Sequence, residues 1–433
     1  MKLTAAALTP VPAQAGGPAA ADMGCRRRAA AWYAGFAALA GLVFAASGQP
    51  VQWTWAAWAA GGYALAALAA VGWRSRGRDA AVIIALAGAL AAPLTWQVTL
   101  GRTMSKSGEG PLQVVARSAA LLLQHGTPYL PTAQISHVLA YDPYEPAMAV
   151  FGLPSALGLH GAAGNPRLWL GLTAVAALAA AFQLARPGST LRCTAFAVGS
   201  PVLALPITTG QTDPPVLALL CLTLAGASAG PRSRGAHLAA GVALGAACAM
   251  KAIAWPALPV VAAMLAARCS MRAAARFAVT AAGTAAALIA AAAPASLATP
   301  AALVQNTVLY PLGLGRYQTL AASPLPGHLL AGTGPAGRWA AIGLLCAAGL
   351  AIAASLVISP PASLRAATWR LALGLALLFT LAPASRWGYF VYPAALLGFA
   401  AMISQRPGAA PARAAPAAAG DGPGPPPEAG LDQ

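Results

Sequence analysis

Acidic residues are scarce in this chain, which has nine aspartates and glutamates against 26 lysines and arginines in 433 residues. Charged residues make up only 8% of the sequence and hydrophobic residues 59%. With several apolar runs of about 18 residues or more, this composition excludes an ordinary soluble domain. The basic residues stand in short clusters between apolar runs and form no single basic face, which argues against nucleic acid as a partner. We therefore expect a helical protein that crosses a membrane many times.

Cysteine and histidine are also few, and neither is grouped. The six cysteines, at positions 25, 193, 221, 248, 269 and 346, show no paired or C-x-x-C spacing, and the five histidines are dispersed. Most of the cysteines fall within apolar runs, where they pack as small hydrophobic residues. We expect no disulfide, no zinc site and no cofactor. A divalent metal held by loop acids stays open as an alternative.

Apolar runs alternate with basic clusters and divide the chain into twelve candidate spans. They cover residues 30–48, 51–73, 80–100, 166–185, 192–209, 213–230, 236–250, 253–267, 275–296, 336–357, 366–383 and 388–404. The seventh and eighth are about 15 residues long, fewer than the ~20 that cross a bilayer. The predicted fold is an all-α polytopic bundle of about twelve transmembrane helices over residues 30–404. The tails, 1–29 and 405–433, are rich in Pro, Ala and Gly and are predicted to be disordered.

The basic residues also predict an orientation. In the twelve-span arrangement, 18 of the 26 lysines and arginines fall on one side of the membrane. By the positive-inside rule this side is cytoplasmic, so both termini are expected in the cytoplasm of a protein of the cell membrane. The apolar stretch 147–159 must then not cross, because counting it as a span would put Arg186 and Arg192 outside. We expect it to lie in the outer interface.

The first large outer loop, 101–165, carries several polar signals. It contains Glu109, and after it Leu112, Val115 and Ala119 recur at helical spacing, which predicts an amphipathic helix on the membrane surface. Gly126 suits the C-terminal cap of this helix.

The same loop continues into an extended segment of aromatic and acidic residues. Tyr129 begins this segment, and the run Tyr-Asp-Pro-Tyr-Glu-Pro follows at 141–146, with Asp142, Tyr144 and Glu145. Aromatic rings beside carboxylates at an interface are one way to bind sugars. The alternative is that the tyrosines only anchor the loop in the headgroup region.

Two further signals lie at predicted outer ends of spans. The polar turn Gly-Gln-Thr-Asp at 210–213 includes Gln211 and Asp213, and Asp213 stands where a helix begins. It can therefore act as a helix cap or carry chemistry. Lys251, the only lysine in an apolar region, stands at the break between two short helices. It can extend to the headgroups or hold a lipid-linked phosphate.

Together, these elements resemble the GT-C superfamily of polytopic glycosyltransferases. The resemblance rests on a loop acid after an early span, an amphipathic helix ending in Gly-Thr-Pro-Tyr (126–129), the element at 141–146, the turn at 210–213, and the Gly241-Val-Ala-Leu-Gly245 helix that runs into Lys251. Within that superfamily the chain looks similar to glycosyltransferase family 87, the polyprenyl-phosphate-mannose-dependent group typical of actinobacteria. The resemblance covers roughly residues 80–400.

The resemblance implies an inverting transfer of a hexose, mannose in the first instance, from a polyprenyl-phosphate-linked sugar to a lipid or glycan acceptor of the cell envelope. The general base would be Glu109 in the first outer loop, with Asp213 as its rival. Lys251, Arg386 and Arg316 would neutralise the donor phosphate. The chain departs from the family pattern at Glu109, because the family more often has Asp followed by an alternating apolar stretch. Here Glu109 lies within Gly-Glu-Gly-Pro.

Residues of the same loops would contact the substrates if the resemblance holds. The candidates for substrate binding are Tyr129, Asp142, Tyr144, Glu145, Gln211 and His328. His328 is a single loop histidine, so the alternative for it is simple solvation. Membrane lipids are the remaining expected partners.

Other functions fit the same composition. A transporter or lipid-handling protein without covalent chemistry would use interrupted helices around Lys251 as its substrate site. A relative that keeps the fold but has lost activity is a third alternative. The acids gather at one predicted face and not at the midplane, which favours chemistry on a lipid-linked donor.

Overall fold

A computed structural model describes residues 18–72, 77–99, 110–298 and 300–404 of the chain. Helices dominate this part of the molecule, which contains no strand, and its one β contact is an isolated parallel bridge between Ala322 and Ser385. Eight helices within it are long and apolar enough to cross a membrane. The protein is therefore an all-α bundle of membrane-spanning type, as its composition predicts. The predicted number of twelve spans is not confirmed.

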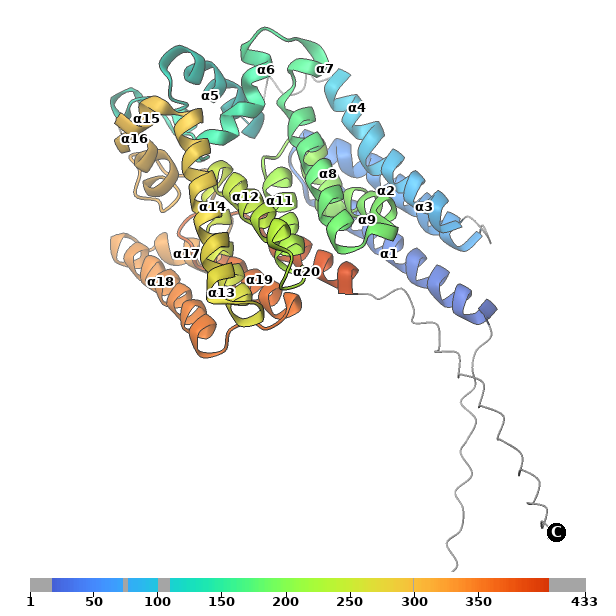
Figure 1. Ribbon diagram of the computed structural model, residues 1–433. Coiled ribbons are helices and arrows are strands. Elements are labelled where there is room, and N and C mark those ends of the chain that lie inside the picture. The colour runs from blue at the N-terminus through green and yellow to red at the C-terminus, as the bar shows by residue number, and fades with distance from the viewer. Residues whose placement is uncertain (1–17, 73–76, 100–109, 299, 405–433) are drawn as a thin grey trace, which may run out of the picture.

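The eight candidate spans lie in a set of long helices distributed along the whole chain (Figure 1). They are α1 (Pro18–Ala46), α2 (Pro50–Gly72), the continuous α3, η1 and α4 (Gly77–Leu86, Ala87–Ala91 and Ala92–Thr99), α8 (Pro166–Ala185), α14 (Met271–Ala292), α18 (Pro335–Ile358), α19 (Leu364–Leu381), and η9 with α20 (Trp387–Phe390 and Val391–Ser404).

Shorter helices fill the intervals. They are α5 (Pro111–His125), η3 (Thr132–Gln134), η4 (Val138–Ala140), η5 (Pro146–Gly152), α6 (Leu153–Ala156), α7 (Gly161–Gly164), η6 (Pro187–Ser189), α9 (Thr190–Val198), α10 (Pro201–Thr209), α11 (Asp213–Ala227), α12 (Arg234–Met250), η7 (Ala252–Ala254), α13 (Ala257–Arg268), α15 (Pro294–Ala298), α16 (Pro300–Val304), η8 (Gln305–Leu309) and α17 (Pro326–Ala331).

Four of the twelve predicted spans are helical but do not qualify as single spans. The fifth is α9 and α10, which meet at a bend of 60°. The sixth, seventh and eighth are α11, α12 and α13, with 15, 17 and 12 residues. A straight helix needs ~20 residues to cross the ~30 Å hydrocarbon core. A bend therefore separates the fifth predicted span from the other eight, and short length separates the sixth, seventh and eighth.

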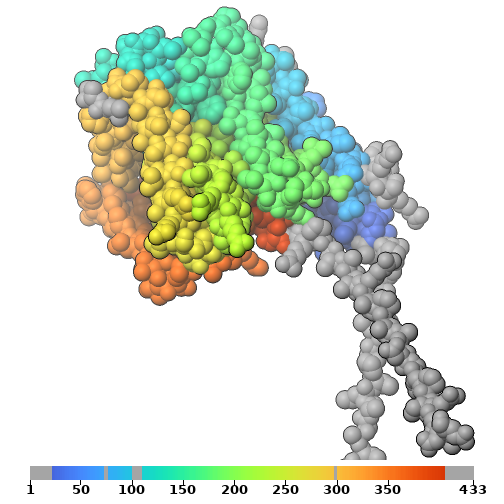
Figure 2. Space-filling view, viewed as in Figure 1, coloured from blue at the N-terminus to red at the C-terminus, as the bar shows by residue number. Residues whose placement is uncertain are grey.

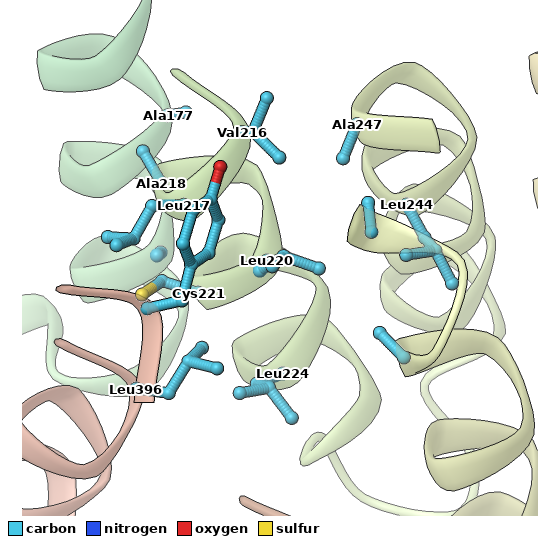
Figure 3. Close-up of a cluster of buried hydrophobic side chains, with 14 of the residues drawn as sticks. Ala177, Val216, Leu217, Ala218, Leu220, Cys221, Leu224, Leu244, Ala247 and Leu396 are labelled. Carbon is cyan, nitrogen blue, oxygen red and sulfur yellow. The ribbon is translucent and has the colours of Figure 1, made fainter. Parts of the chain in front are cut away.

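The short helix α11 lies at the centre of the largest hydrophobic cluster. All but two of its 15 residues are buried. Figure 3 shows its side chains between α8, α12 and α20, with Leu220 and Leu224 on the side of Leu244 of α12, and Cys221 on the side of Leu396 of α20. A helix that is apolar on every face is expected to be enclosed by other helices. Enclosure by protein explains how an apolar helix can be shorter than the bilayer.

Two glycines let α12 pack closely against α14. A β-carbon at Gly241 would lie 3.0 Å from the carbonyl oxygen of Phe277, and one at Gly245 would lie 2.5 Å from that of Ala281. Small residues four apart on one helix face permit such backbone approach between membrane helices. The Gly-x-x-x-Gly spacing that contributes to the family resemblance therefore has a packing role in this fold.

The N-terminal helices form a second, alanine-rich cluster. Trp55 of α2 donates from Nε1 to the carbonyl oxygen of Ala89 at 2.8 Å, within the π-helical turn η1, where the usual backbone pattern is interrupted. The same helix α2 passes close to η1, because a β-carbon at Gly62 would lie 2.7 Å from the Cα of Gly88.

The predicted boundary of the N-terminal tail falls inside α1. This helix begins at Pro18, so residues 18–29 are helical, and the guanidinium of Arg26 donates to the carbonyl oxygens of Ala70 and Val71 at the end of α2. Alanine favours helix formation, and arginine near a helix C-terminus satisfies carbonyls that have no partner within the helix. Residues 1–17 and 405–433 lie outside the described residues.

The helices α5, α6 and α7 gather at one end of the bundle, and Figure 2 shows them covering it. We call this the site end. The amphipathic helix predicted after Glu109 is α5, and Gly126 caps it in the left-handed conformation (φ +67°), as expected. The stretch predicted to lie in the outer interface forms the short η5 and α6, which are too short to cross a bilayer. Most of η5 is buried against protein.

The opposite end contains the starts of α12 and α14. Figure 1 shows the turns from α13 to α14 and from α18 to α19 there, with the first residues of α1 and the last residues of α20 on the same side. We call it the arginine end, after Arg234, Arg268, Arg272, Arg276 and Arg365. Both ends of the described chain thus lie away from the site end.

Candidate functional site

Asp213 and Lys251 form a buried ion pair at the site end. Gly210 ends α10 in a left-handed turn (φ +73°), and Asp213 then begins α11. Lys251 follows the last residue of α12, where the backbone becomes extended. Its Nζ lies 2.6 Å from Asp213 Oδ1, and each residue is 8% exposed. The pair joins two motifs that stand 38 residues apart in the sequence.

These contacts give neither residue the purely structural role that the sequence left open for it. The Asp213 side chain accepts hydrogen bonds from Lys251 and Tyr392, and no helix-capping bond to a backbone N–H is seen for it in the described part of α11. Lys251 extends inward to the carboxylate, not outward to a headgroup region. Removing one partner of such a buried pair strongly destabilises the folded protein, because the other charge is left buried without a counter-charge.

Two tyrosines complete the surroundings of the pair. The hydroxyl of Tyr392, from α20, donates to Asp213 Oδ1 at 2.8 Å. The Lys251 ammonium lies 5.2 Å from the ring centroid of Tyr144, a cation–π distance. Burial raises the pKa of the Tyr144 phenol above its ordinary value, while the side chain of Thr212 lowers it. Tyr144 therefore stays protonated and neutral beside the lysine.

Asp142 lies two residues before Tyr144 and is held on both oxygens. Ser118 of α5 donates to its Oδ2 at 2.6 Å, and the backbone N–H of Tyr144 donates to its Oδ1 at 3.0 Å. Its own N–H donates to Asn306 at 2.8 Å. Burial raises the pKa of Asp142 to about 7, although these hydrogen bonds and the charge of Arg117 lower it. Its pKa is thus moved from the acidic range toward neutral pH.

Glu145 is the second acid with a raised pKa at the site end. Burial, and then the nearby charge of Asp142, raise its pKa to about 7. Its backbone N–H donates to the carbonyl oxygen of Met250 at 3.1 Å, which fixes it beside the Lys251 break. Among the contacts that the structure describes, no hydrogen bond restrains the Glu145 carboxylate. Of the described acids here, it is the one most available to an incoming proton.

Tyr129 and an aromatic stack fix the loop that carries these acids. Tyr129 is buried and donates from its hydroxyl to the carbonyl oxygen of Tyr144 at 2.8 Å. Burial raises the pKa of Tyr129 well above its ordinary value, and the charges of Asp142 and Glu145 raise it by smaller amounts. Tyr141 stacks on Tyr310 with ring centroids 4.1 Å apart, and its hydroxyl accepts from the N–H of Arg316 at 3.0 Å. The tyrosines of this loop therefore hold structure and are not free at a surface.

An open cavity of about 320 Å³ lies at the same end of the bundle, and neither Lys251 nor any of the acids described above lines it. Its lining comes from α5, α6, α7 and the start of α8: Leu112, Gln113, Ala116, Ser155, Leu159, His160, Gly161, Gly164, Asn165 and Pro166. Leu112 also packs against Gly210, since a β-carbon at Gly210 would lie 2.5 Å from the Leu112 Cδ1. Leu112 thus contacts both the cavity and the turn that leads through Gln211 to Asp213.

The structure does not bring all the predicted site residues together. Arg386 and Arg316 are exposed, and Arg316 lies with its guanidinium carbon 5.6 Å from the ring centroid of Tyr317. His328 Nδ1 is 3.0 Å from the carbonyl oxygen of Pro383, so the histidine has a protein partner. Glu109, the predicted general base, lies outside the described residues.

Several residues of the cluster are not among the sequence predictions. Ser118 could have been found, because it shares the buried face of α5 with Val115. Asn306 and Tyr392 are polar groups within apolar runs, which is a usable signal in a membrane protein. Tyr310 gives no such signal, because its role depends on a stack with a residue far away in the sequence.

No protein-family model matches the chain, and no curated protein or solved structure matches it. In the described parts of the chain, no three histidine, cysteine, aspartate or glutamate side chains gather in a way that could hold a metal ion.

Proposed function

We propose that the protein is a membrane glycosyltransferase that moves a hexose, with mannose the first to test, from a polyprenyl-phosphate donor to a lipid or glycan of the cell envelope. The observation that carries the proposal is the buried Asp213–Lys251 pair. It links the Gly-Gln-Thr-Asp turn to the lysine break, two of the elements on which the family resemblance rests. Two acids with a pKa of about 7 belong to the segment whose Tyr144 ring lies at Lys251, and an open cavity lies at the same end of the bundle.

The proposed reaction is an inverting displacement. The oxygen of an acceptor hydroxyl forms a bond to the anomeric carbon, and the bond from that carbon to the phosphate oxygen breaks. The electron pair leaves with polyprenyl phosphate, and the hydroxyl proton passes to a carboxylate. General-base assistance of this kind contributes roughly 10² to 10⁴ in rate. A positive charge near the phosphate favours the developing negative charge.

Glu109 is the proposed base by resemblance, and Glu145 is the described acid that fits the role best. A pKa of about 7 keeps part of the Glu145 population ionised and basic at neutral pH. Asp213 is the weaker candidate, since its Oδ1 already accepts from Lys251 and Tyr392. We assign Asp213 the task of positioning Lys251. Lys251 would meet the donor phosphate, and the exposed Arg386 and Arg316 are assigned to it by the resemblance alone.

The same proposal includes an orientation. The site end would face the outside of the cell membrane and the arginine end the cytoplasm, because the positive-inside rule places arginine-rich turns inside. The described ends of α1 and α20 lie on the arginine side (Figure 1), which is compatible with two cytoplasmic termini.

The test uses the full chain in nanodiscs with radiolabelled polyprenyl-phosphate-mannose and a pool of envelope lipids. We expect label to move to a lipid or glycan in the wild type. Glu109→Gln or Glu145→Gln should lower the transfer rate at least about 100-fold, whichever carries the base, while donor binding persists. Asp79→Asn is the matched control, because Asp79 is an exposed carboxylate paired with Arg192. A second series with chelator tests for a divalent metal.

Absence of transfer and hydrolysis from mannose, glucose and arabinose donors would contradict the proposal. In that case two alternatives are left: a transporter or lipid-handling protein, and a relative that keeps the fold but has lost activity. A specific observation favours transport as the second candidate: α9 and α10 meet at 60°, and the Lys251 break holds a buried charge between two short helices. Interrupted helices of this kind form substrate sites in transporters. Movement of a labelled polyprenyl phosphate across vesicles without covalent change would support it.

A further inference from the structure

A small cavity lies at the arginine end, where α12 and α14 begin. Its volume is about 70 Å³, and it is lined by Arg234, His237 and Leu238 of α12 and by Ala273, Arg276 and Phe277 of α14. For scale, a water molecule occupies ~30 Å³ of the liquid. The cavity therefore has room for a small polyatomic group. It is separated from the Lys251 break by about 20 Å along α12.

His237 gives this cavity an unused polar atom. The residue is 5% exposed, and its Nε2 is buried without a hydrogen-bond partner among the described residues. A buried polar atom left without a partner costs about 1–3 kcal/mol, so most such atoms are satisfied. The ring lines the cavity, so a group bound there would be in position to bond with Nε2.

The charges around the cavity are positive. Arg234 and Arg276 are exposed at its rim, and neither forms an ion pair with a described acid. The Nε of Arg276 donates to the carbonyl oxygen of Arg272, which leaves its terminal nitrogens to face other partners. The cavity also lies in the first two turns of α12, a helix of 17 residues, and of α14, a helix of 22 residues. Helix N-termini favour anions.

We propose that this cavity is a binding site for a phosphate group, with His237 at its floor and Arg234 and Arg276 at its rim. A phosphate offers the acceptor oxygens that two guanidinium groups and an imidazole N–H require. Two sources share this chemistry: the headgroup of an anionic phospholipid and free phosphate. Basic notches between membrane helices bind such headgroups. The proposal does not depend on the transferase activity.

The test measures lipid and phosphate binding to the full chain in neutral detergent. Native mass spectrometry with added phosphatidylglycerol or phosphatidylcholine gives the affinity for each headgroup. In the free-phosphate arm, the midpoint of thermal unfolding in sodium phosphate is compared with that in sodium chloride at equal ionic strength. We expect phosphatidylglycerol to bind more tightly than phosphatidylcholine. Arg234→Gln with Arg276→Gln should weaken it about tenfold, since charge-assisted hydrogen bonds are lost.

Two further variants separate a built site from a general attraction to charge. His237→Phe keeps a ring in the cavity but removes the nitrogen, and should weaken phosphatidylglycerol binding several-fold; its thermal midpoint without lipid shows whether it folds. Arg232→Gln with Arg365→Gln removes the same charge from elsewhere at the arginine end and should change the affinity less than about twofold. If only the phosphate arm depends on the cavity residues, free phosphate is the source. If neither arm does, or if both double variants have equal effects, the proposal is wrong.

Discussion

The two ends of α12 differ in whether their positive charges have an acidic partner. At the site end, Lys251 is buried and its charge is balanced by Asp213 at 2.6 Å. At the arginine end, Arg234 and Arg276 are exposed and no acid among the described residues pairs with them. A helix of 17 residues connects the two ends. The charge at the site end is therefore neutralised within the protein, whereas the charges at the arginine end can attract an anion from outside the protein.

This difference bears on what each end can bind. A lysine already paired with a carboxylate has less net attraction for an anion, so donor phosphate at the site end would need Arg386 or Arg316 as well, both exposed. The arginine end needs no such help, because its guanidinium groups lack acidic partners in the described structure. Binding of an anion at the site end would thus have to offset the Asp213–Lys251 attraction, whereas at the arginine end the charges of Arg234 and Arg276 are already available beside the cavity.

Breaking the buried pair is expected to have the largest effect. Asp213→Asn or Lys251→Met leaves one partner without its counter-charge, and each should lower the free energy of unfolding by about 3–5 kcal/mol. The double variant should lose less than the two singles added together, because no unpaired charge remains. Chemical unfolding of the full chain in detergent measures all three.

The exposed pair Asp79–Arg192 provides the matched control for the buried one. Its side chains are 57% and 65% exposed, and its N–O distance is 2.9 Å. Asp79→Asn should change stability by less than about 1 kcal/mol, because solvent screens an exposed pair. Equal losses of unfolding free energy at the two pairs would show that burial does not make the Asp213–Lys251 pair more important for stability than the exposed one.

A bulkier residue at Gly245 should disturb the helix that joins the two ends. A β-carbon there would lie 2.5 Å from the Ala281 carbonyl oxygen and 2.6 Å from the Thr284 Cβ, so α12 and α14 would have to move apart. We expect Gly245→Leu to cost about 1–3 kcal/mol or more. Gly283→Leu is the control, because nothing lies within 4 Å of a β-carbon at that position of α14. Equal midpoints of thermal unfolding for the two variants would argue against close packing at Gly245.

Much of the helical fold could be predicted from the sequence. Apolar runs located a helix at each of the twelve predicted segments, and Gly126 marked the end of α5. These features are local, since run length and cap residues lie within one stretch of chain. The number of true spans was not predictable in this way. α11 has a span's composition but is enclosed by other helices, and enclosure depends on the rest of the fold.

The candidate site was predictable as separate residues but not as an arrangement. Asp213 and Lys251 were both singled out, yet the sequence assigned them different tasks, as rival base and phosphate ligand. Their pairing follows from the antiparallel packing of α11 and α12, which places two distant positions together. Tyr392 joins them from the last helix. Contacts between segments far apart in the chain carry no local sequence signal.

A further expected effect concerns pH and the acids next to the buried pair. Asp142 has a folded-state pKa of about 7 against an ordinary value of 3.8, so the folded protein binds more protons than the unfolded chain between these values. Stability from this group is therefore fully present below about pH 4 and falls as the pH rises to about 7, by at most about 1.4 kcal/mol per pH unit. Asp142→Asn should flatten the dependence of the thermal midpoint on pH over this range. The Asn side chain can still accept from the Tyr144 N–H, and its loss of charge should also lower the pKa of Glu145. Curves for the variant and the wild type that stay parallel from pH 4 to 7 would place the titrating group elsewhere.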